Sequence, residues 1–239
     1  MKMASAPAAP VHLLFLLALA LAATAAAAVT FEAINAVPDS AGGQRFDQDF
    51  GGVEYAKQVL SEASSFIWTT FNEPSPEDRP GYDSVTLTLV DNIQPGAVAV
   101  TSGNAIQLGA QSVAEINGDA DTVKEAVNGV LYHEATHVWQ WGLQDYGKKS
   151  GLFEGIADYV RLKAGLPAGN WGQPGEGNQW DQGYDVTAYF LDYCDSLKPG
   201  FVAEMNGKLK DGYSDDYFVQ ILGKSADELW SDYKAKYSS

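Results

Sequence analysis

The stretch that decides the fold, residues 119–141, reads DADTVKEAVNGVLYHEATHVWQW. Asp119 or Asp121 can cap the start of a helix here, because a carboxylate accepts hydrogen bonds from the free N–H groups of the first turn. Apolar residues then recur three and four positions apart, which is the spacing of one buried helical face. These residues are Val123, Ala126, Val127, Val130 and Leu131. The pattern predicts an amphipathic helix that runs directly into two histidines.

His133 and His137 stand four positions apart on this predicted helix, so their imidazoles project from one face and can converge on one metal ion. Glu134 stands beside the first histidine, where a carboxylate can act as a base on water. Together they form the HExxH pattern that is typical of the zinc helix of metallopeptidases. The chain has three histidines, and the third is His12, close to the N-terminus. We therefore predict a site for one Zn²⁺ ion per chain.

A second predicted helix, Leu152 to Ala164, offers two candidates for a third ligand. Glu154 and Asp158 are four positions apart, so both carboxylates point the same way. Two histidines and one glutamate are the protein ligands of one class of catalytic zinc site, so Glu154 fits the ligand role. Asp158 would then accept the outer N–H of a ligand histidine. The alternative is an exposed helix face on which Asp158 forms a weak salt bridge with Arg161.

Residues 29–118 are rich in strand patterns. Apolar and polar residues alternate in two segments, and a Ser102-Gly103 turn joins two more segments as a hairpin. The predicted strands are 29–34, 84–90, 97–101 and 104–108. Apolar residues at helical spacing over 55–71 predict a helix that packs on this sheet.

Residues 119–239 are dominated by helical patterns. A glycine-rich loop is expected over 167–179, and residues 144–151 are expected to turn the chain. Beyond the two helices already described, the predicted helices are 185–197, 200–209, 214–222 and 225–237. The last one opens with a capping box of Ser225 and Glu228. We therefore predict an α+β fold over residues 29–239, as one domain with a sheet lobe, the zinc helix and a mostly helical C-terminal lobe.

The first 28 residues have the pattern of a secretory signal peptide. Lys2 precedes an apolar run from Val11 to Leu21, and alanines lead up to Ala28, as at a small-residue cleavage site. The alternative is a membrane anchor, but the run is short for one. We therefore expect cleavage after residue 28, secretion, and no membrane contact afterwards.

Acidic residues outnumber basic ones, with 31 Asp and Glu against 15 Lys and Arg and a net charge of −16. Because phosphate binding relies on clustered Lys and Arg, nucleic acids and anionic membranes are not expected partners. Cys194 is the single cysteine, so it forms no disulfide within the chain, and we expect it buried on a helix.

Four segments together resemble the plant basic secretory protein family and span nearly the whole mature chain. They are HEATHVWQW (133–141), GLFEGIADYVR (151–161), WDQGYDVT (180–187) and LWSDYK (229–234). The resemblance implies an extracellular zinc metallopeptidase of the plant apoplast that is linked to defence. The second segment is also similar to the glutamate-ligand helix of gluzincin peptidases, which supports Glu154 over Asp158 as the ligand. The chain departs from the family's name in being strongly acidic.

The likeness to gluzincins also implies where a peptide substrate binds. In those enzymes the strand before the zinc helix lies at the sheet edge and pairs with the extended peptide. Asn104, Ile106 and Gln107 stand where such a strand is expected, although a core or hairpin strand without a ligand fits the sequence equally well.

The hydrolytic transition state also needs a hydrogen-bond donor for the developing oxyanion. Because no third histidine remains in the mature chain, a tyrosine or arginine has to serve. Tyr184, beside Gly183, is the candidate, and the alternative is a tyrosine that only packs in the core or on the surface.

The sequence as a whole predicts a secreted, zinc-dependent peptidase that acts on peptides or proteins. Glu134 would take a proton from water and pass it to the leaving amine. The alternative is a catalytically silent defence or binding protein that keeps zinc for stability. Glu134 argues against this alternative, because a purely structural zinc site has no use for a base.

Overall fold

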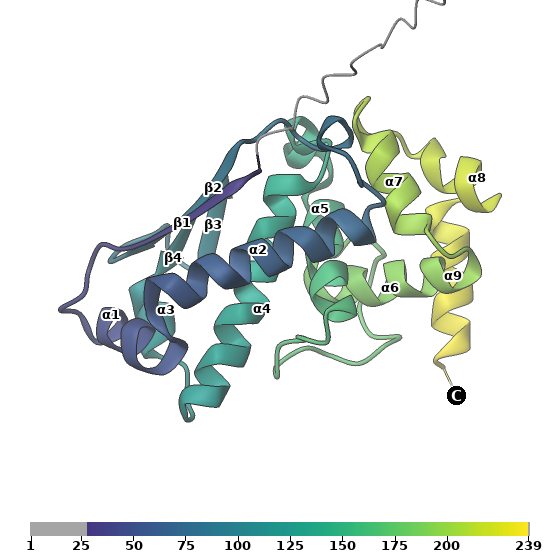
Figure 1. Cartoon of the computed structure of the whole chain (residues 1–239). Coiled ribbons are helices and arrows are strands. Elements are labelled where there is room, and N and C mark those ends of the chain that lie inside the picture. Colours follow the sequence, from purple (N-terminus) through teal and green to yellow (C-terminus); the bar gives the residue numbers. More distant parts are fainter. Residues whose placement is uncertain (1–27, 239) are drawn as a thin grey trace, which may run out of the picture.

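The structure is a computed structural model that describes residues 28–238 (Figure 1). The predicted signal peptide lies outside these residues, except for Ala28. The four predicted strands are all present, as β1 (Thr30–Asn35), β2 (Ser84–Val90), β3 (Ala99–Ser102) and β4 (Ala105–Gly109). Within the described range, no helix combines the length and the apolar character that crossing a bilayer requires.

The strands form one mixed sheet in the order β1-β2-β4-β3. β1, β2 and β4 run parallel, and β3 pairs antiparallel with β4 as the second arm of the predicted hairpin. The expectation that residues 104–109 form the sheet edge is therefore wrong. β4 is enclosed on both sides, because β2 occupies one side and the hairpin folds β3 back onto the other. The edge strand nearest the helix that carries the HExxH pattern is β3.

Two long helices cover one face of this sheet. They are α2 (Gly52–Thr70), which corresponds to the helix predicted over 55–71, and α4 (Ala120–Trp139), which carries the HExxH pattern. The alternation of the strands explains the cover, since every second side chain of β2 and β4 points to this face and is buried there. The buried strand residues are Val85, Leu87, Leu89, Ile106 and Leu108. The apolar face of α4 therefore lies on the core while its histidines remain at the rim.

The C-terminal half is helical, as predicted, and lies to the right of the sheet in Figure 1. Its helices are α5 (Tyr146–Lys163), α6 (Tyr184–Leu197), α7 (Phe201–Leu209), α8 (Asp216–Leu222) and α9 (Ala226–Lys236). α5 and α6 approach closely because Gly155 has no side chain, and a Cβ there would lie 2.2 Å from Thr187 Cγ2. Cys194 is buried on α6, as expected. The capping box of Ser225 and Glu228 is present.

Some elements differ from the sequence prediction. The short helices α1 (Ala41–Arg45) and α3 (Ala110–Ala114) were not predicted, because five residues are too few to show a helical period. Helix α5 begins at Tyr146, within the segment expected to be a turn. A non-helical Lys149, with φ −144° and ψ 47°, separates its first turn from the rest. This kink explains why the apolar periodicity starts only later.

A buried carboxylate joins the two halves of the molecule. Glu73, in the segment after α2, accepts a hydrogen bond from Asn206 Nδ2 of α7 at 2.9 Å. The Oδ1 atom of Asn206 in turn accepts from the backbone N–H of Trp141, just after α4, at 2.9 Å. Burial raises the pKa of Glu73 to about 8, although the nearby Arg79 guanidinium opposes the shift. Glu73 is therefore neutral in the fold at neutral pH.

This shift predicts that Glu73 makes the fold less stable as pH rises. The unfolded chain releases the Glu73 proton near its ordinary pKa of 4.5, whereas the folded chain keeps it up to about 8. Between these values the folded state holds more protons, so the free energy of unfolding falls with increasing pH. Glu73→Gln keeps the acceptor for Asn206 without a charge and should remove this loss. Urea unfolding from pH 4.5 to 8.5 should show the variant gaining stability over the parent as pH rises. The exposed Glu77→Gln variant is the control, and a gain that does not vary with pH would contradict the assignment.

Candidate metal centre

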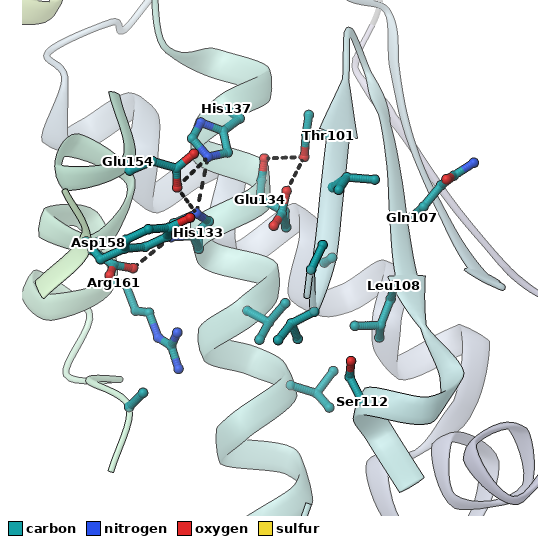
Figure 2. A pocket seen from close by; sticks show the side chains of 18 of the residues that line it. Thr101, Gln107, Leu108, Ser112, His133, Glu134, His137, Glu154, Asp158 and Arg161 are labelled. Atoms are coloured by element: carbon teal, nitrogen blue, oxygen red, sulfur yellow. Dashed lines mark hydrogen bonds and ion pairs between the residues drawn. The ribbon is translucent and has the colours of Figure 1, made fainter. Parts of the chain in front are cut away.

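His133 and His137 lie on successive turns of α4, as their spacing predicted. Asp119 caps the start of this helix by accepting a hydrogen bond from the backbone N–H of Thr122 at 3.0 Å. The two Nε2 atoms point at each other across 3.2 Å, and both side chains are buried. The helix therefore presents two converging nitrogen donors at one point of its surface (Figure 2).

Helix α5 brings two carboxylates to the same point. Glu154 Oε2 lies 3.1 Å from His133 Nε2 and 3.7 Å from His137 Nε2. The possible ligand atoms of these three residues all lie within 4.8 Å of one another, so they can hold a metal ion. Asp158, one turn later, lies on the far side of the His133 ring, with Oδ1 2.7 Å from Nδ1. The structure thus separates the two carboxylates, with Glu154 facing the cluster centre and Asp158 behind one histidine.

The donor set fits zinc in both kind and spacing. Two imidazole nitrogens and one carboxylate oxygen are a known set of ligands for Zn²⁺, which they bind at ~2.0–2.2 Å. Tetrahedral ligands at such distances lie roughly 3.4 Å apart. The distances of 3.1, 3.2 and 3.7 Å among the three ligand atoms are close to that separation.

The electrostatics of the cluster favour positive charge. Burial alone would lower the pKa of His133, but hydrogen bonds to Asp158 and Glu154 outweigh it and raise the pKa to about 10. Burial opposes ionisation of Glu154, yet its contacts with His133 and His137 hold the pKa of this carboxyl well below its usual range. A buried group of carboxylates that draws a proton so strongly is also suited to a metal cation.

Each imidazole is oriented by a neighbour at its Nδ1 atom. The Asp158 carboxylate can accept from Nδ1–H of His133, which leaves Nε2 of that ring as the metal-facing lone pair. The Gln140 amide contacts Nδ1 of His137 at 3.0 Å, and its Oε1 is buried without a partner among the described residues. A half-turn of this amide places Oε1 as the acceptor from Nδ1–H. Both Nε2 atoms are then available as ligands.

Glu134 is buried next to the histidines and is held by the sheet. The hydroxyl of Thr101, on the edge strand β3, donates to Glu134 Oε2 at 2.6 Å. Figure 2 shows Glu134 on the strand side of α4, whereas Glu154 and Asp158 lie on the α5 side. The carboxylate is thus close to the cluster without being part of the ligand set.

Two tyrosines border the cluster. Tyr146 donates to Glu154 Oε1 at 2.5 Å, which leaves Oε2 for the histidines. Tyr184 is 56% exposed, and its ring stacks parallel to His133 with centroids 6.1 Å apart. Its φ of 47° is unusual for a residue with a side chain. Such a backbone is found mostly where the surroundings enforce it, often at functional sites.

A groove of about 1340 Å³ runs past the cluster. Its floor is formed by α4, one wall is β3, and the other wall includes Tyr184 and Trp171. Of the predicted substrate residues, Gln107 lines the groove, but Ile106 is fully buried in the core. The amide of Asn104 is bonded to Ser84 O at 2.9 Å. The residues of β4 are therefore poorly placed to pair with a peptide, in contrast to β3.

Three residues at the site were missed in the sequence: Thr101, Gln140 and Tyr146. Gln140 stands three positions after His137, so helical spacing alone would have placed it near that ring. Thr101 and Tyr146 carry no such signal, because their contacts depend on where β3 and the start of α5 lie in the fold.

Comparisons with known proteins agree with this picture. Residues 26–233 match the BSP family, described as "Peptidase of plants and bacteria". A stretch of 59 residues is 46% identical to the "Basic secretory protease" of Boswellia serrata and covers 25% of this chain and 67% of that protein. No solved structure matches the chain significantly. Because the family match covers most of the sequence and includes the whole site, the chain belongs to the basic secretory protein family of plant and bacterial peptidases.

Proposed function

We propose that this peptidase is a secreted, zinc-dependent enzyme that hydrolyses peptide bonds in the groove beside α4. The observation that carries the proposal is the buried cluster of His133, His137 and Glu154, with Glu134 beside it and outside the ligand set. Burying a carboxylate costs stability, so a buried Glu134 that binds no metal is better explained by a chemical role than by a structural one.

His133, His137 and Glu154 would hold the ion, and the other side chains would position them. Zn²⁺ held there would acidify a bound water molecule and polarise the substrate carbonyl. Asp158 fixes the tautomer of His133 and makes its Nε2 a better donor. Tyr146 occupies one oxygen of Glu154, so this carboxylate binds through the other.

Glu134 would serve as the general base and then as the acid. Its carboxylate takes a proton from the attacking water and delivers that proton to the leaving amine nitrogen. The hydrogen bond from Thr101 keeps one oxygen fixed and leaves the other for the water. An oriented base reacts with little reorganisation, which lowers the barrier.

Tyr184 remains the proposed donor to the oxyanion. Burial, reinforced by the nearby carboxylates of Glu154 and Asp158, raises the pKa of its hydroxyl, so this group stays protonated and able to donate. The corresponding hydroxyl of Tyr146 already donates to Glu154. The two tyrosines therefore have separate roles in the proposal.

An extended peptide would lie along β3, which replaces β4 as the proposed pairing strand. β3 forms the outer edge of the sheet and one wall of the groove, so its backbone can pair with a substrate strand. Thr101 on this strand also holds the base, which would link substrate binding to the position of Glu134.

Secretion to the plant extracellular space and a role in defence complete the proposal. Secretion is supported by the signal-peptide pattern of residues 1–28 and by the relative that is named a secretory protease. The role in defence rests only on the resemblance to the plant basic secretory protein family. No step of the proposed chemistry depends on them.

The ligand assignment predicts different metal losses for two carboxylate variants. Glu154→Ala removes a ligand and should strip most zinc at neutral pH. Asp158→Asn removes only the acceptor behind His133 and should weaken zinc binding ~10–100-fold, leaving a site that refills. Metal analysis after dialysis against a weak chelator measures both, with the exposed Glu125→Gln variant on α4 as control. Equal zinc content in the two variants would refute the assignment, and the reverse order would make Asp158 the ligand.

Substitution of the two tyrosines should affect different properties, kcat for Tyr184 and zinc retention for Tyr146. Tyr184→Phe should keep zinc and fold but lower kcat by ~10² or more, because a preorganised donor acts mainly in the transition state. Tyr146→Phe should instead weaken zinc retention, since it releases Glu154 Oε1. Steady-state kinetics and zinc content of both variants measure this difference. If Tyr184→Phe leaves kcat unchanged, Tyr184 has only a structural role.

The decisive test of the proposed function is Glu134→Gln. Gln keeps the hydrogen bond from Thr101 but cannot take a proton, so the variant should fold and bind one zinc ion. Its rate of hydrolysis of an unfolded protein substrate should fall by several orders of magnitude, and added zinc should not restore it. Glu125→Gln is the matched control and should cut like the parent.

The same assay identifies the alternative function. A pure, zinc-loaded parent that cuts nothing across a broad peptide library would favour a zinc-stabilised binding protein. A Glu134→Gln variant that cuts as fast as the parent would overturn the proposed mechanism.

A further inference from the structure

Arg161 is a cation in the wall of the groove. It lies on α5, one turn after Asp158, and is partly buried. Among the groove-lining residues that the structure describes, it is the only Lys or Arg. Figure 2 shows its side chain on the α5 side of α4, extending away from His133 toward the start of that helix.

The zinc helix accommodates this side chain at a glycine. Gly129 lies four positions before His133, hence on the same face of α4, and it is buried in the middle of the helix. A Cβ at this position would lie 2.6 Å from both Nε and Nη2 of Arg161. Glycine inside a helix costs about 1 kcal/mol relative to alanine. The contact with the guanidinium gives a physical reason for this glycine.

The guanidinium is held in place, but only by one of its nitrogens. Nε donates to the backbone oxygen of Leu166 at 2.7 Å, and the group lies 5.6 Å from the Trp171 ring. Neither Nη atom has a hydrogen-bond acceptor among residues 28–238. Asp158 attracts the charge but lies beyond ion-pair distance, and its Oδ1 is bonded to His133. Two N–H donor groups thus remain available beside the groove.

Paired Nη atoms bind a carboxylate through two parallel hydrogen bonds. A partly desolvated cation without an anion is energetically unfavourable, so an incoming carboxylate would compensate it. Asp158 also lines the groove, where it is bonded to His133. The other charged residues that line the groove outside the metal cluster and Glu134 are the acidic Glu115 and Asp185. They disfavour an anion elsewhere, so a carboxylate is expected to bind at one position.

We propose that Arg161 is a specificity residue that binds a carboxylate of the substrate peptide. The carboxylate belongs to an acidic side chain or to the free C-terminus of the peptide. It lies in the part of the peptide that extends from the scissile bond toward the start of α4. The proposal rests on the proposed function in one respect, since it requires the peptide to occupy the groove. It goes beyond that function by naming which substrates the groove prefers.

Peptide binding without turnover tests this directly. Zinc-loaded Glu134→Gln protein is titrated with pairs of fluorescent peptides. The two peptides of a pair differ only by Asp or Asn at one position, and the series of pairs covers each position of the peptide in turn. Each peptide is made with a free and an amidated C-terminus. We expect that Asp at one position, or the free C-terminus, tightens binding by roughly 10- to 100-fold relative to the uncharged peptide. This factor corresponds to the free energy of a charge-assisted hydrogen bond.

Four substitutions in the same background separate recognition from structure. Arg161→Gln should abolish the preference, and Arg161→Lys should keep part of it, because a point charge lacks the paired donors. Gly129→Ala leaves the charge in place but displaces the guanidinium, so it should reduce the preference without destabilising the helix. Lys163→Gln removes a positive charge from the same helix outside the groove and should change nothing.

The outcomes also distinguish this inference from the proposed function. Binding that prefers carboxylates through Arg161, combined with no hydrolysis by the parent, would support the inference and refute the peptidase proposal. Hydrolysis by the parent, combined with an equal affinity for acidic and neutral peptides, would support the peptidase proposal and refute the inference. If Arg161→Gln fails to fold, an unchanged preference in Gly129→Ala and Arg161→Lys would still overturn the inference. Absence of any peptide binding would overturn it as well.

Discussion

The convergence of α4 and α5 on one buried point is the constraint on which the rest of the structure depends. Two histidines and two carboxylates meet there with atom separations of 2.7 to 3.7 Å. Such contacts tolerate little movement, so both helices need rigid support. The sheet and α2 support α4 from one side. Helix α6 supports α5, where Gly155 lets the two helices approach.

The buried carboxylates of this acidic chain have different hydrogen-bond and ion-pair partners, and these partners suit them to different roles. Glu154 remains charged because two histidines face it and hold its pKa low, and Asp158 is bonded to His133. Glu134 accepts a hydrogen bond from Thr101 and lies outside the group of His133, His137 and Glu154, as its proposed role as a base requires. Glu73 has one amide partner and is neutral in the fold. Burial therefore gives related side chains different chemistry according to their neighbours.

The groove has two walls of different character. On one side, β3 has no strand paired to its outer edge among the described residues, and it carries Thr101, which donates to the proposed base Glu134. On the other side, α5 and the segments around it supply side chains, among them Arg161 and Tyr184. A peptide between these walls would be aligned by backbone pairing and selected by side-chain chemistry.

The sequence by itself determined the helix with the two histidines, the carboxylate pair on α5, the four strands and most helices. These features depend on spacing along the chain, and a helical period of 3.6 residues or a strand period of two is local. Only the tertiary structure decided that β3 rather than β4 forms the edge. It also brought Thr101 to Glu134, Tyr146 to Glu154, and the guanidinium of Arg161 to Gly129. Periodicity states which face of an element is buried but not which distant element meets that face. These partners were therefore fixed by packing between segments far apart in the chain.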